Sequence, residues 1–159
     1  MTDTQQTQNH AVLIMGCPEV PVQMGIGIYC AHMLNTHGWE VTTAGNPSVI
    51  HLLRAADPER HYVKKVMDLD KCIEDLAEKR RAFDLAVVFA HNDAGISYAA
   101  TVRHLSPSRL VVVIFGRNAE DLAQQIDFPC ETIAEKAVHN PAELKKKMNE
   151  VFGWRASTS

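Results

Sequence analysis

The sequence predicts a three-layer α/β/α sandwich, in which a mostly parallel, doubly wound (Rossmann-like) sheet lies between two layers of helices. Two observations predict this α/β fold. Short apolar runs rich in valine, isoleucine and leucine alternate six times with segments whose apolar residues recur at helical spacing. The apolar runs are continuous rather than alternating with polar residues, which is typical of parallel strands covered by helices on both faces.

Three strand–helix units are expected in the first half of the chain. Residues 10–15 form a short apolar run, and residues 21–37 carry apolar side chains at helical spacing. Residues 39–44 form the second strand and are followed by a short helix that stops near Pro58. Residues 61–67 are expected to form a short edge strand. The residues that mark the helix boundaries are Gly38 as a stop, and Asn46 (before Pro47) and Asp68 as caps.

The second half repeats the same order with three further strands. Residues 84–90 and 109–115 are continuous apolar runs, and residues 130–138 form a more alternating strand. A helix is expected after each of them. Two of these helix starts are marked by Asn118 paired with Asp121, and by Asn140 before Pro141. The boundaries that follow are a disordered tail at 1–9, a single α/β domain over 10–152 and a C-terminal tail at 153–159.

Composition argues against several classes of protein. The chain has 16 Lys and Arg against 19 Asp and Glu, a net charge of −3 and no basic stripe, which argues against nucleic acid or an anionic membrane surface as a partner. No apolar run approaches the roughly 20 residues that span a bilayer, and the polar N-terminal residues do not form a signal peptide. The four cysteines show no CxxC spacing, so neither a disulfide framework nor a zinc knuckle is indicated. A reduced, cytoplasmic protein is expected.

Polar residues gather where the predicted strands end. In open α/β sheets, ligands bind outside the carboxyl ends of the strands, at the point where the strand order reverses. The strand ends carry Gly16, Cys17 and Glu19; Asn46; His91, Asn92 and Asp93; Arg117; and His139. If the first strand is central, Cys17 and Glu19 would face residues 91–93 across one crevice. The candidate ligand-binding residues are therefore Gly16, Cys17, Glu19, Asn46, Asn92 and Arg117.

A small anionic ligand is one candidate for this crevice. Asn46, Arg117 and the backbone N–H groups at helix N-termini would hold its charge. Each of the candidate residues also has a purely structural explanation. Asn46 and Asn92 would serve as helix caps, Gly16 would allow a tight turn, and Arg117 would be a solvated loop charge.

Cys17 is the most informative residue of the set. A thiol in a strand-to-helix loop lies outside the core, and a nearby helix N-terminus would stabilise its thiolate. A thiol enzyme or sulfur carrier would use Cys17 as nucleophile, His91 as base and Asp93 to orient His91. The alternative is that Cys17 is only a small residue suited to the turn.

Motifs for metals and nucleotides are weak or absent. Metal-ligand atoms are present on Cys17, His91 and His139, with Glu19 or Asp93 as a fourth ligand. These residues show no paired spacing, so no metal site is predicted. The chain has no GxxxxGK[ST] and no GxSxG motif, which argues against a P-loop and a common α/β-hydrolase. Gly25 and Gly27 lie inside the first predicted helix, where they cannot form the glycine-rich turn that binds a pyrophosphate. No motif in the sequence identifies a cofactor, which is therefore unknown.

Short motifs follow several of the predicted strands and turns. They are Gly16-Cys17-Pro18-Glu19 with Pro21-Val22-Gln23, Asn46-Pro47, Ala56-Asp57-Pro58-Glu59, Met67-Asp68-Leu69 with Cys72-Ile73, Asn92-Asp93-Ala94 and His139-Asn140-Pro141. Together they resemble a small domain-of-unknown-function family of methanogenic archaea, over about residues 10–152. The Gly-Cys-Pro-Glu block is the most specific part of the resemblance. The resemblance implies an archaeal, anaerobic, cytosolic protein with a three-layer α/β/α fold, and it implies no assigned activity.

A more distant similarity is to the sulfur-relay (DsrE-type) fold, whose members work as oligomers and pass persulfide sulfur through a cysteine. The strand–helix order with Gly38-Trp39-Glu40-Val41 carries this similarity. The usual relay cysteine lies in a later loop than Cys17, and the loop after Ala90 offers His91 and no cysteine.

Three hypotheses about function remain open. The first is a small binding protein that holds a ligand or cofactor at the strand-end crevice, as an accessory of anaerobic metabolism. The second is a thiol enzyme or sulfur carrier that uses Cys17. The third is a non-catalytic assembly subunit with an exposed Tyr62 or Trp154 at a protein interface. A homo-oligomer is expected under each hypothesis, because small α/β domains often bury an edge strand or helix face in this way.

Overall fold

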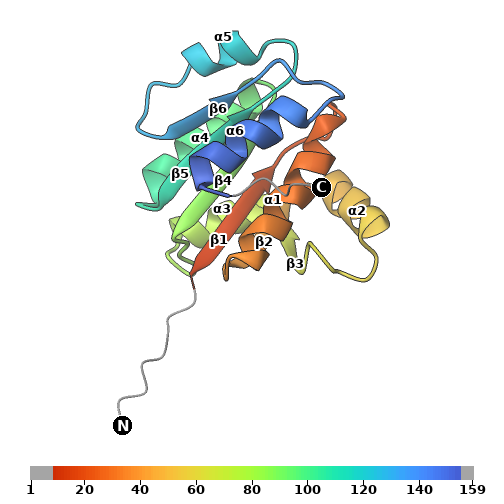
Figure 1. The fold of residues 1–159 in the computed structure, drawn as a ribbon. Coiled ribbons are helices and arrows are strands. Elements are labelled where there is room, and N and C mark those ends of the chain that lie inside the picture. Colours follow the sequence, from red (N-terminus) through yellow and green to blue (C-terminus); the bar gives the residue numbers. More distant parts are fainter. Residues whose placement is uncertain (1–8, 155–159) are drawn as a thin grey trace.

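The computed structural model describes residues 9–154 and contains a six-stranded parallel sheet (Figure 1). The strands are β1 (His10–Met15), β2 (Glu40–Gly45), β3 (Lys65–Asp68), β4 (Leu85–Ala90), β5 (Arg109–Ile114) and β6 (Glu131–Ala134). The helices are α1 (Val22–Thr36), α2 (Pro47–Ala56), α3 (Leu69–Ala77), α4 (Asp93–Leu105), α5 (Ala119–Gln124) and α6 (Ala142–Phe152). The strand order β3–β2–β1–β4–β5–β6 confirms the predicted doubly wound α/β fold.

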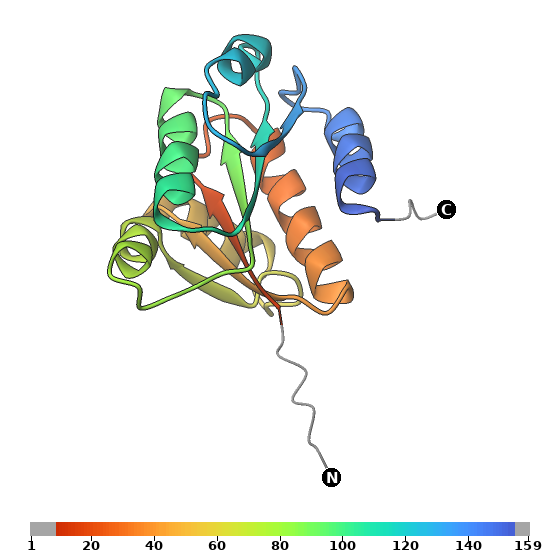
Figure 2. The ribbon, with the colours of Figure 1, turned by 90° about the vertical axis from the view of Figure 1, so that its left-hand side faces the viewer.

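Two helix layers cover the sheet, as the turned view in Figure 2 shows. Helices α1, α2 and α6 pack on one face, where Leu13 and Phe89 of the sheet share a buried cluster with Ile26 of α1. Helices α3, α4 and α5 pack on the other face, against Ile14 and Val88. Both faces of the central strands are therefore buried, which explains their continuous apolar sequences. Within residues 9–154, no helix is both long enough and apolar enough to cross a membrane.

The loop between α2 and β3 is organised by one buried carboxylate. Asp57 accepts hydrogen bonds from the backbone N–H groups of His61, Tyr62 and Val63, at 2.8–2.9 Å. The loop takes up residues that the sequence assigned to a strand, so β3 begins at Lys65 rather than at residue 61. Burial raises the pKa of Asp57, but the three N–H donors and His61 outweigh it, and the pKa lies below its ordinary value.

Two sequence predictions near the C-terminal end are wrong. Strand β6 covers Glu131–Ala134 rather than 130–138, because the backbone makes a tight turn at Glu135. The side chain of Asn118 makes no capping hydrogen bond to α5, so the expected cap with Asp121 does not form. Two other predicted caps are confirmed: the side chains of Asn46 and Asp68 each accept a hydrogen bond from a backbone N–H at the start of the following helix. Asn140 also accepts the N–H of Ala142, but α6 begins one residue later than predicted, with Pro141 at the cap position.

Trp154 lies in the core rather than on the surface. It is 6% exposed, and its ring stacks on Phe152 with a centroid distance of 4.5 Å. The expectation of an exposed Trp154 at a protein interface is therefore wrong, whereas Tyr62 is 44% exposed as expected. Residues 1–8 and 155–159, which belong to the predicted tails, lie outside the described residues.

Two helical glycines provide a direct test of how closely the helices approach the sheet. A Cβ atom at Gly95 in α4 would lie 2.7 Å from the Cα of Ala90 in β4, whereas a Cβ at Gly25 in α1 would meet nothing within 4 Å. We expect Gly95→Ala to destabilise the protein by about 1–3 kcal/mol, because α4 must move away from β4. Gly25→Ala should instead stabilise it by up to about 1 kcal/mol. Urea unfolding measures the free energy of unfolding of both variants. Equal changes in that free energy would contradict the close packing of α4 on β4.

The Asp57 carboxylate should make stability depend on pH in the acid range. Because its folded pKa is lowered, its contribution is fully present above the ordinary pKa of 3.8 and is lost as the pH falls through the lower folded value. We expect Asp57→Asn to cost about 1–3 kcal/mol at pH 7, through weaker bonds to the loop N–H groups. The difference from the wild type should shrink below about pH 4. Asp127→Asn, at an exposed carboxylate, is the matched control. A stability difference between Asp57→Asn and the wild type that does not change with pH would contradict the lowered pKa of Asp57.

Candidate functional site

The predicted crevice lies between β1 and β4, where the strand order reverses. Helix α1 covers one face of the sheet and α4 the other, so the loops that lead to these two helices diverge. Two further loops join the site. The N–H of Gly116 donates to the carbonyl of Ala137 at 2.8 Å, and the N–H of Val22 donates to that of Val138 at 2.9 Å. These bonds tie the loops after β5 and β6 to the start of α1.

Glu19 and His91 face each other across this crevice. Glu19 Oε2 lies 3.8 Å from His91 Nε2, and Glu19 Oε1 lies 3.6 Å from the Sγ of Cys17, which donates to it. These distances confirm that the loop after β1 faces the start of the loop after β4. One exposed carboxylate thus stands beside both a thiol and an imidazole.

The imidazole of His91 is nearly enclosed by the protein. Its side chain is 6% exposed, and its ring packs on Phe115 with a centroid distance of 5.6 Å. Nε2 is buried and has no hydrogen-bond partner among the described residues, since 3.8 Å to Glu19 is too long for a hydrogen bond. Burial lowers the pKa of His91, against the opposing effect of Glu19, so the ring is neutral near pH 7. A neutral imidazole has one donor and one acceptor nitrogen.

Gln23 is a second buried polar group near this site, and no sequence motif marked it as a candidate site residue. It lies in the first turn of α1 with no exposed surface, and its Nε2 donates to the carbonyl of Gly16 at 3.1 Å. Its Oε1 has no partner within residues 9–154. Its position in the sequence could have indicated its burial, because Gln23 lies in the apolar helical stripe that continues with Ile26 and Cys30.

Cys17 is exposed, and its surroundings do not favour a thiolate. Partial desolvation and the Glu19 carboxylate raise the pKa of the Cys17 thiol above its ordinary value. This direction is opposite to the one expected from a helix N-terminus beside Cys17. Asp93 is exposed in the first turn of α4, and within the described part of the chain it forms no ion pair or hydrogen bond with His91. Cys17, His91 and Asp93 do not form a hydrogen-bonded triad.

Two of the side chains expected to hold an anion use their oxygen atoms as helix caps, and the third, Arg117, has no ion-pair partner among the described residues. Asn46 Oδ1 accepts from the N–H of Val49 at 3.0 Å, and Asn92 Oδ1 accepts from the N–H of Gly95 at 3.1 Å, so both serve as helix caps. Arg117 is exposed in the loop after β5, and no ion pair to it occurs among residues 9–154. At the start of α1, the first N–H groups bond to backbone carbonyls of the protein itself.

His139 stands apart from the crevice residues. It is exposed in the loop after β6, beside a cavity of about 370 Å³ lined by residues 135–140 and Glu143. In the part of the chain that the structure describes, no three His, Cys, Asp or Glu side chains lie close enough to hold a metal ion. The structure thus does not bring Cys17, His91 and His139 together as a ligand set.

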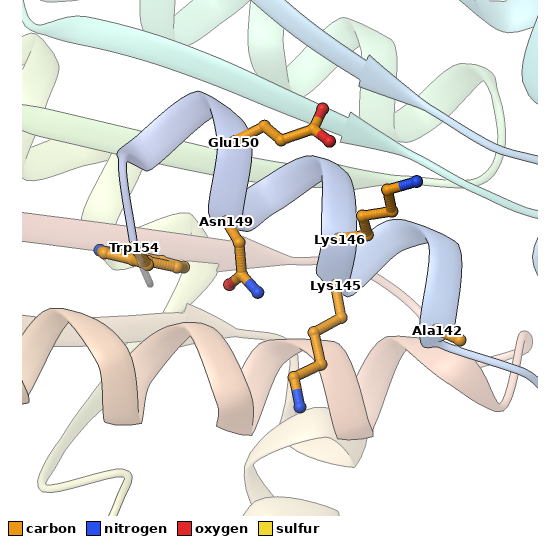
Figure 3. Close-up of a pocket in the computed structure, with 6 residues that line it drawn as sticks. All are labelled: Ala142, Lys145, Lys146, Asn149, Glu150 and Trp154. Atoms are coloured by element: carbon orange, nitrogen blue, oxygen red, sulfur yellow. The ribbon is translucent and has the colours of Figure 1, made fainter. Parts of the chain in front are cut away.

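Another cavity, of about 390 Å³, is lined by residues of α6 and by Trp154 (Figure 3). Lys145 and Asn149 point toward α1, where Lys145 Nζ lies 4.9 Å from the centre of the Tyr29 ring and Asn149 accepts from the Tyr29 hydroxyl. Trp154 meets the same ring edge-on, at 6.1 Å between centroids. The polar groups that point inward have partners in the protein, so we interpret this region as the contact that fastens α6 to α1.

Comparison with known proteins identifies relatives along nearly the whole domain. An uncharacterized protein of Methanocaldococcus jannaschii, MJ0452, is 27% identical over 145 residues, which cover 89% of this chain and 95% of that protein. The solved structure of MT0777 is 33% identical, covers 93% of this chain and 99% of its own chain, and superposes with a TM-score of 0.85. The α/β fold is therefore shared with a solved structure.

A family of unknown function was expected from the short motifs. Residues 12–151 match the family described as "Domain of unknown function (DUF1890)". One relative comes from a methanogenic archaeon, as the resemblance implied. The match spans most of the chain, and the protein therefore belongs to the DUF1890 domain family.

Proposed function

We propose that this protein binds a small ligand in the crevice between β1 and β4, as an accessory protein in the cytoplasm of an anaerobic archaeon. The observation that carries the proposal is the buried Nε2 of His91, which lies at the switch point without a hydrogen-bond partner among residues 9–154. Leaving such a group unpaired costs about 1–3 kcal/mol. A ligand that bonds to Nε2 would recover this cost on binding.

The charges at the crevice favour a ligand that carries hydrogen-bond donors. Glu19 supplies a carboxylate, while the lowered pKa of His91 and the raised pKa of Cys17 keep both of those side chains neutral near pH 7. The side-chain oxygens of Asn46 and Asn92 already accept backbone N–H groups as helix caps, which leaves Glu19 and His91 as the acceptors for such a ligand. We therefore propose a small amine or amide group, bonded to Glu19 and to His91 Nε2, rather than an anion at this place.

Thiol chemistry at Cys17 is the second candidate. It is favoured by the exposure of Cys17 in the loop after β1. Against it stand the raised pKa of the thiol and the surroundings of His91, whose Nε2 lies near the Glu19 carboxylate, at 3.8 Å, and makes no hydrogen bond to Cys17 or Asp93. A nucleophilic cysteine normally needs a cation or base that lowers its pKa.

The binding proposal is tested by native mass spectrometry of protein purified without oxygen. We expect the wild-type protein to retain a non-covalent mass that is lost on unfolding. His91→Asn should lower its occupancy about tenfold, as expected for the loss of about 1.4 kcal/mol. His104→Asn changes an exposed histidine at the end of α4 and should leave occupancy unchanged. Bare wild-type protein, or equal occupancy in the His91 variant with an unchanged unfolding midpoint, would overturn the proposal.

Thiol reactivity separates the two candidates. We expect iodoacetamide to label Cys17 before the buried Cys30 and Cys72, because only Cys17 of these three is exposed. Its rate at pH 7 should nevertheless be lower than that of an unstructured cysteine peptide, and Glu19→Gln should raise it several-fold by removing the nearby charge. Peptide mass spectrometry measures the rates, with Glu120→Gln as the control at a remote exposed carboxylate. A Cys17 that reacts faster than the free peptide would favour the thiol enzyme instead.

A further inference from the structure

Five cationic side chains line one cavity beside the edge strand β3. The cavity has a volume of about 370 Å³ and is formed by the end of α2, the loop after it, β3 and the loop before β4. Its charged lining residues are Arg54, Arg60, Lys64, Lys65 and Arg81. No carboxylate lines it, although the whole chain carries a net charge of −3. Such a concentration of one sign against an acidic background is an unusual feature of this surface.

The positive charge of this cavity is only partly neutralised by the protein. Lys65 pairs with Glu40, and Arg81 Nε pairs with Asp75 Oδ2 at 3.2 Å. Arg60 and Lys64 form no ion pair with any residue from 9 to 154. Like charges held around one concave surface repel each other, and an anion placed between them would relieve that repulsion.

A third cation, Arg54, is also without a carboxylate partner. Its Nη1 donates instead to the carbonyl of Val63, at 2.9 Å. This bond fixes the side chain of Arg54 against the loop without neutralising its charge. The cavity therefore offers three guanidinium or ammonium groups whose charge the described protein does not balance.

The loop that presents Arg60 and Lys64 is held in one conformation. The Asp57 carboxylate accepts the N–H groups of the three residues that lie between Arg60 and Lys64. Arg60 itself has a φ of +58°, in the left-handed region that non-glycine residues rarely adopt. The N–H of Arg60 donates to the carbonyl of Asp57 at 3.1 Å. Because the backbone that carries Arg60 and Lys64 is ordered in advance, it loses little conformational entropy when a ligand binds.

We propose that this cavity, which we call the β3 cleft, binds the phosphate groups of a small phosphorylated molecule, a di- or triphosphate in particular. Arginine and lysine together recognise phosphate oxygens through directed donors and point charges. The cleft is a single concave site, whereas nucleic acid requires an extended basic stripe that this surface does not offer. Lys65 begins β3, so the cleft lies toward the amino ends of the strands and away from the crevice at their carboxyl ends.

Calorimetric titration of the full-length protein with inorganic triphosphate tests this inference. We expect saturable binding of one triphosphate at about 20 mM salt, weakened about tenfold or more at 200 mM salt by ionic screening. Arg60→Gln combined with Lys64→Gln should weaken binding at least about tenfold, the loss of 1.4 kcal/mol or more. Lys136→Gln combined with Lys146→Gln makes the same change of net charge outside the cleft and should alter the affinity less than about twofold.

Three outcomes would overturn the inference. One is the absence of binding to the wild type under low salt, and another is equal weakening in both double variants, which would indicate only nonspecific attraction. The third is tighter binding of a single-stranded oligonucleotide than of triphosphate, which would assign the surface to nucleic acid. Unchanged unfolding midpoints of the variants show that any loss of binding is not a loss of fold. None of these results depends on ligand binding at His91.

Discussion

In a parallel sheet, neighbouring strands can be followed by helices on the same face or on opposite faces, and only the second case opens a space between their loops. The two central strands, β1 and β4, are such a pair, and the position of the crevice depends on them. The Glu19 side chain comes from one loop and His91 from the other, and their separation of 3.8 Å exists only because those strands are adjacent. The hydrogen bond from Gln23 to the Gly16 carbonyl and the packing of His91 on Phe115 support the same edge.

The structure gives the two ends of the sheet different electrostatic character. At the carboxyl ends, Glu19 stands beside a neutral imidazole and a thiol that is also neutral near pH 7. Toward the amino ends, the β3 cleft gathers five cations with no carboxylate in its lining. The sequence suggested one small anionic ligand at the strand-end crevice. We propose instead a ligand with hydrogen-bond donors at His91 and, separately, a phosphate at the β3 cleft. Family membership does not choose between functions, so the choice depends on these local contacts.

Most of the fold could be predicted because it depends on local patterns. Continuous apolar runs marked the central strands, and Asn46 and Asp68 marked helix starts through contacts three residues away. The adjacency of β1 and β4 followed from a general rule of strand order, and it correctly placed Glu19 opposite His91.

The remaining features depend on contacts between residues that are distant in sequence or on burial. The predicted start of β3 was too early, because Asp57 accepts hydrogen bonds from three backbone N–H groups that would otherwise extend the strand. The raised pKa of Cys17 depends on the orientation of Glu19, and the buried state of Gln23 depends on how α1 meets β1. The β3 cleft could not be predicted because Arg54 comes from the end of α2 and Arg81 from the loop before β4, so the two form no run in the sequence.

The proposed ligand bonds to His91 Nε2 in the crevice between β1 and β4. Crystals of the protein soaked with a set of small amines and amides would reveal it. We expect bound molecules within hydrogen-bond distance of both His91 Nε2 and the Glu19 carboxylate. Molecules that gather only in the cavity beside α6 and Trp154, while the crevice stays empty in every soaked crystal, would overturn the proposal.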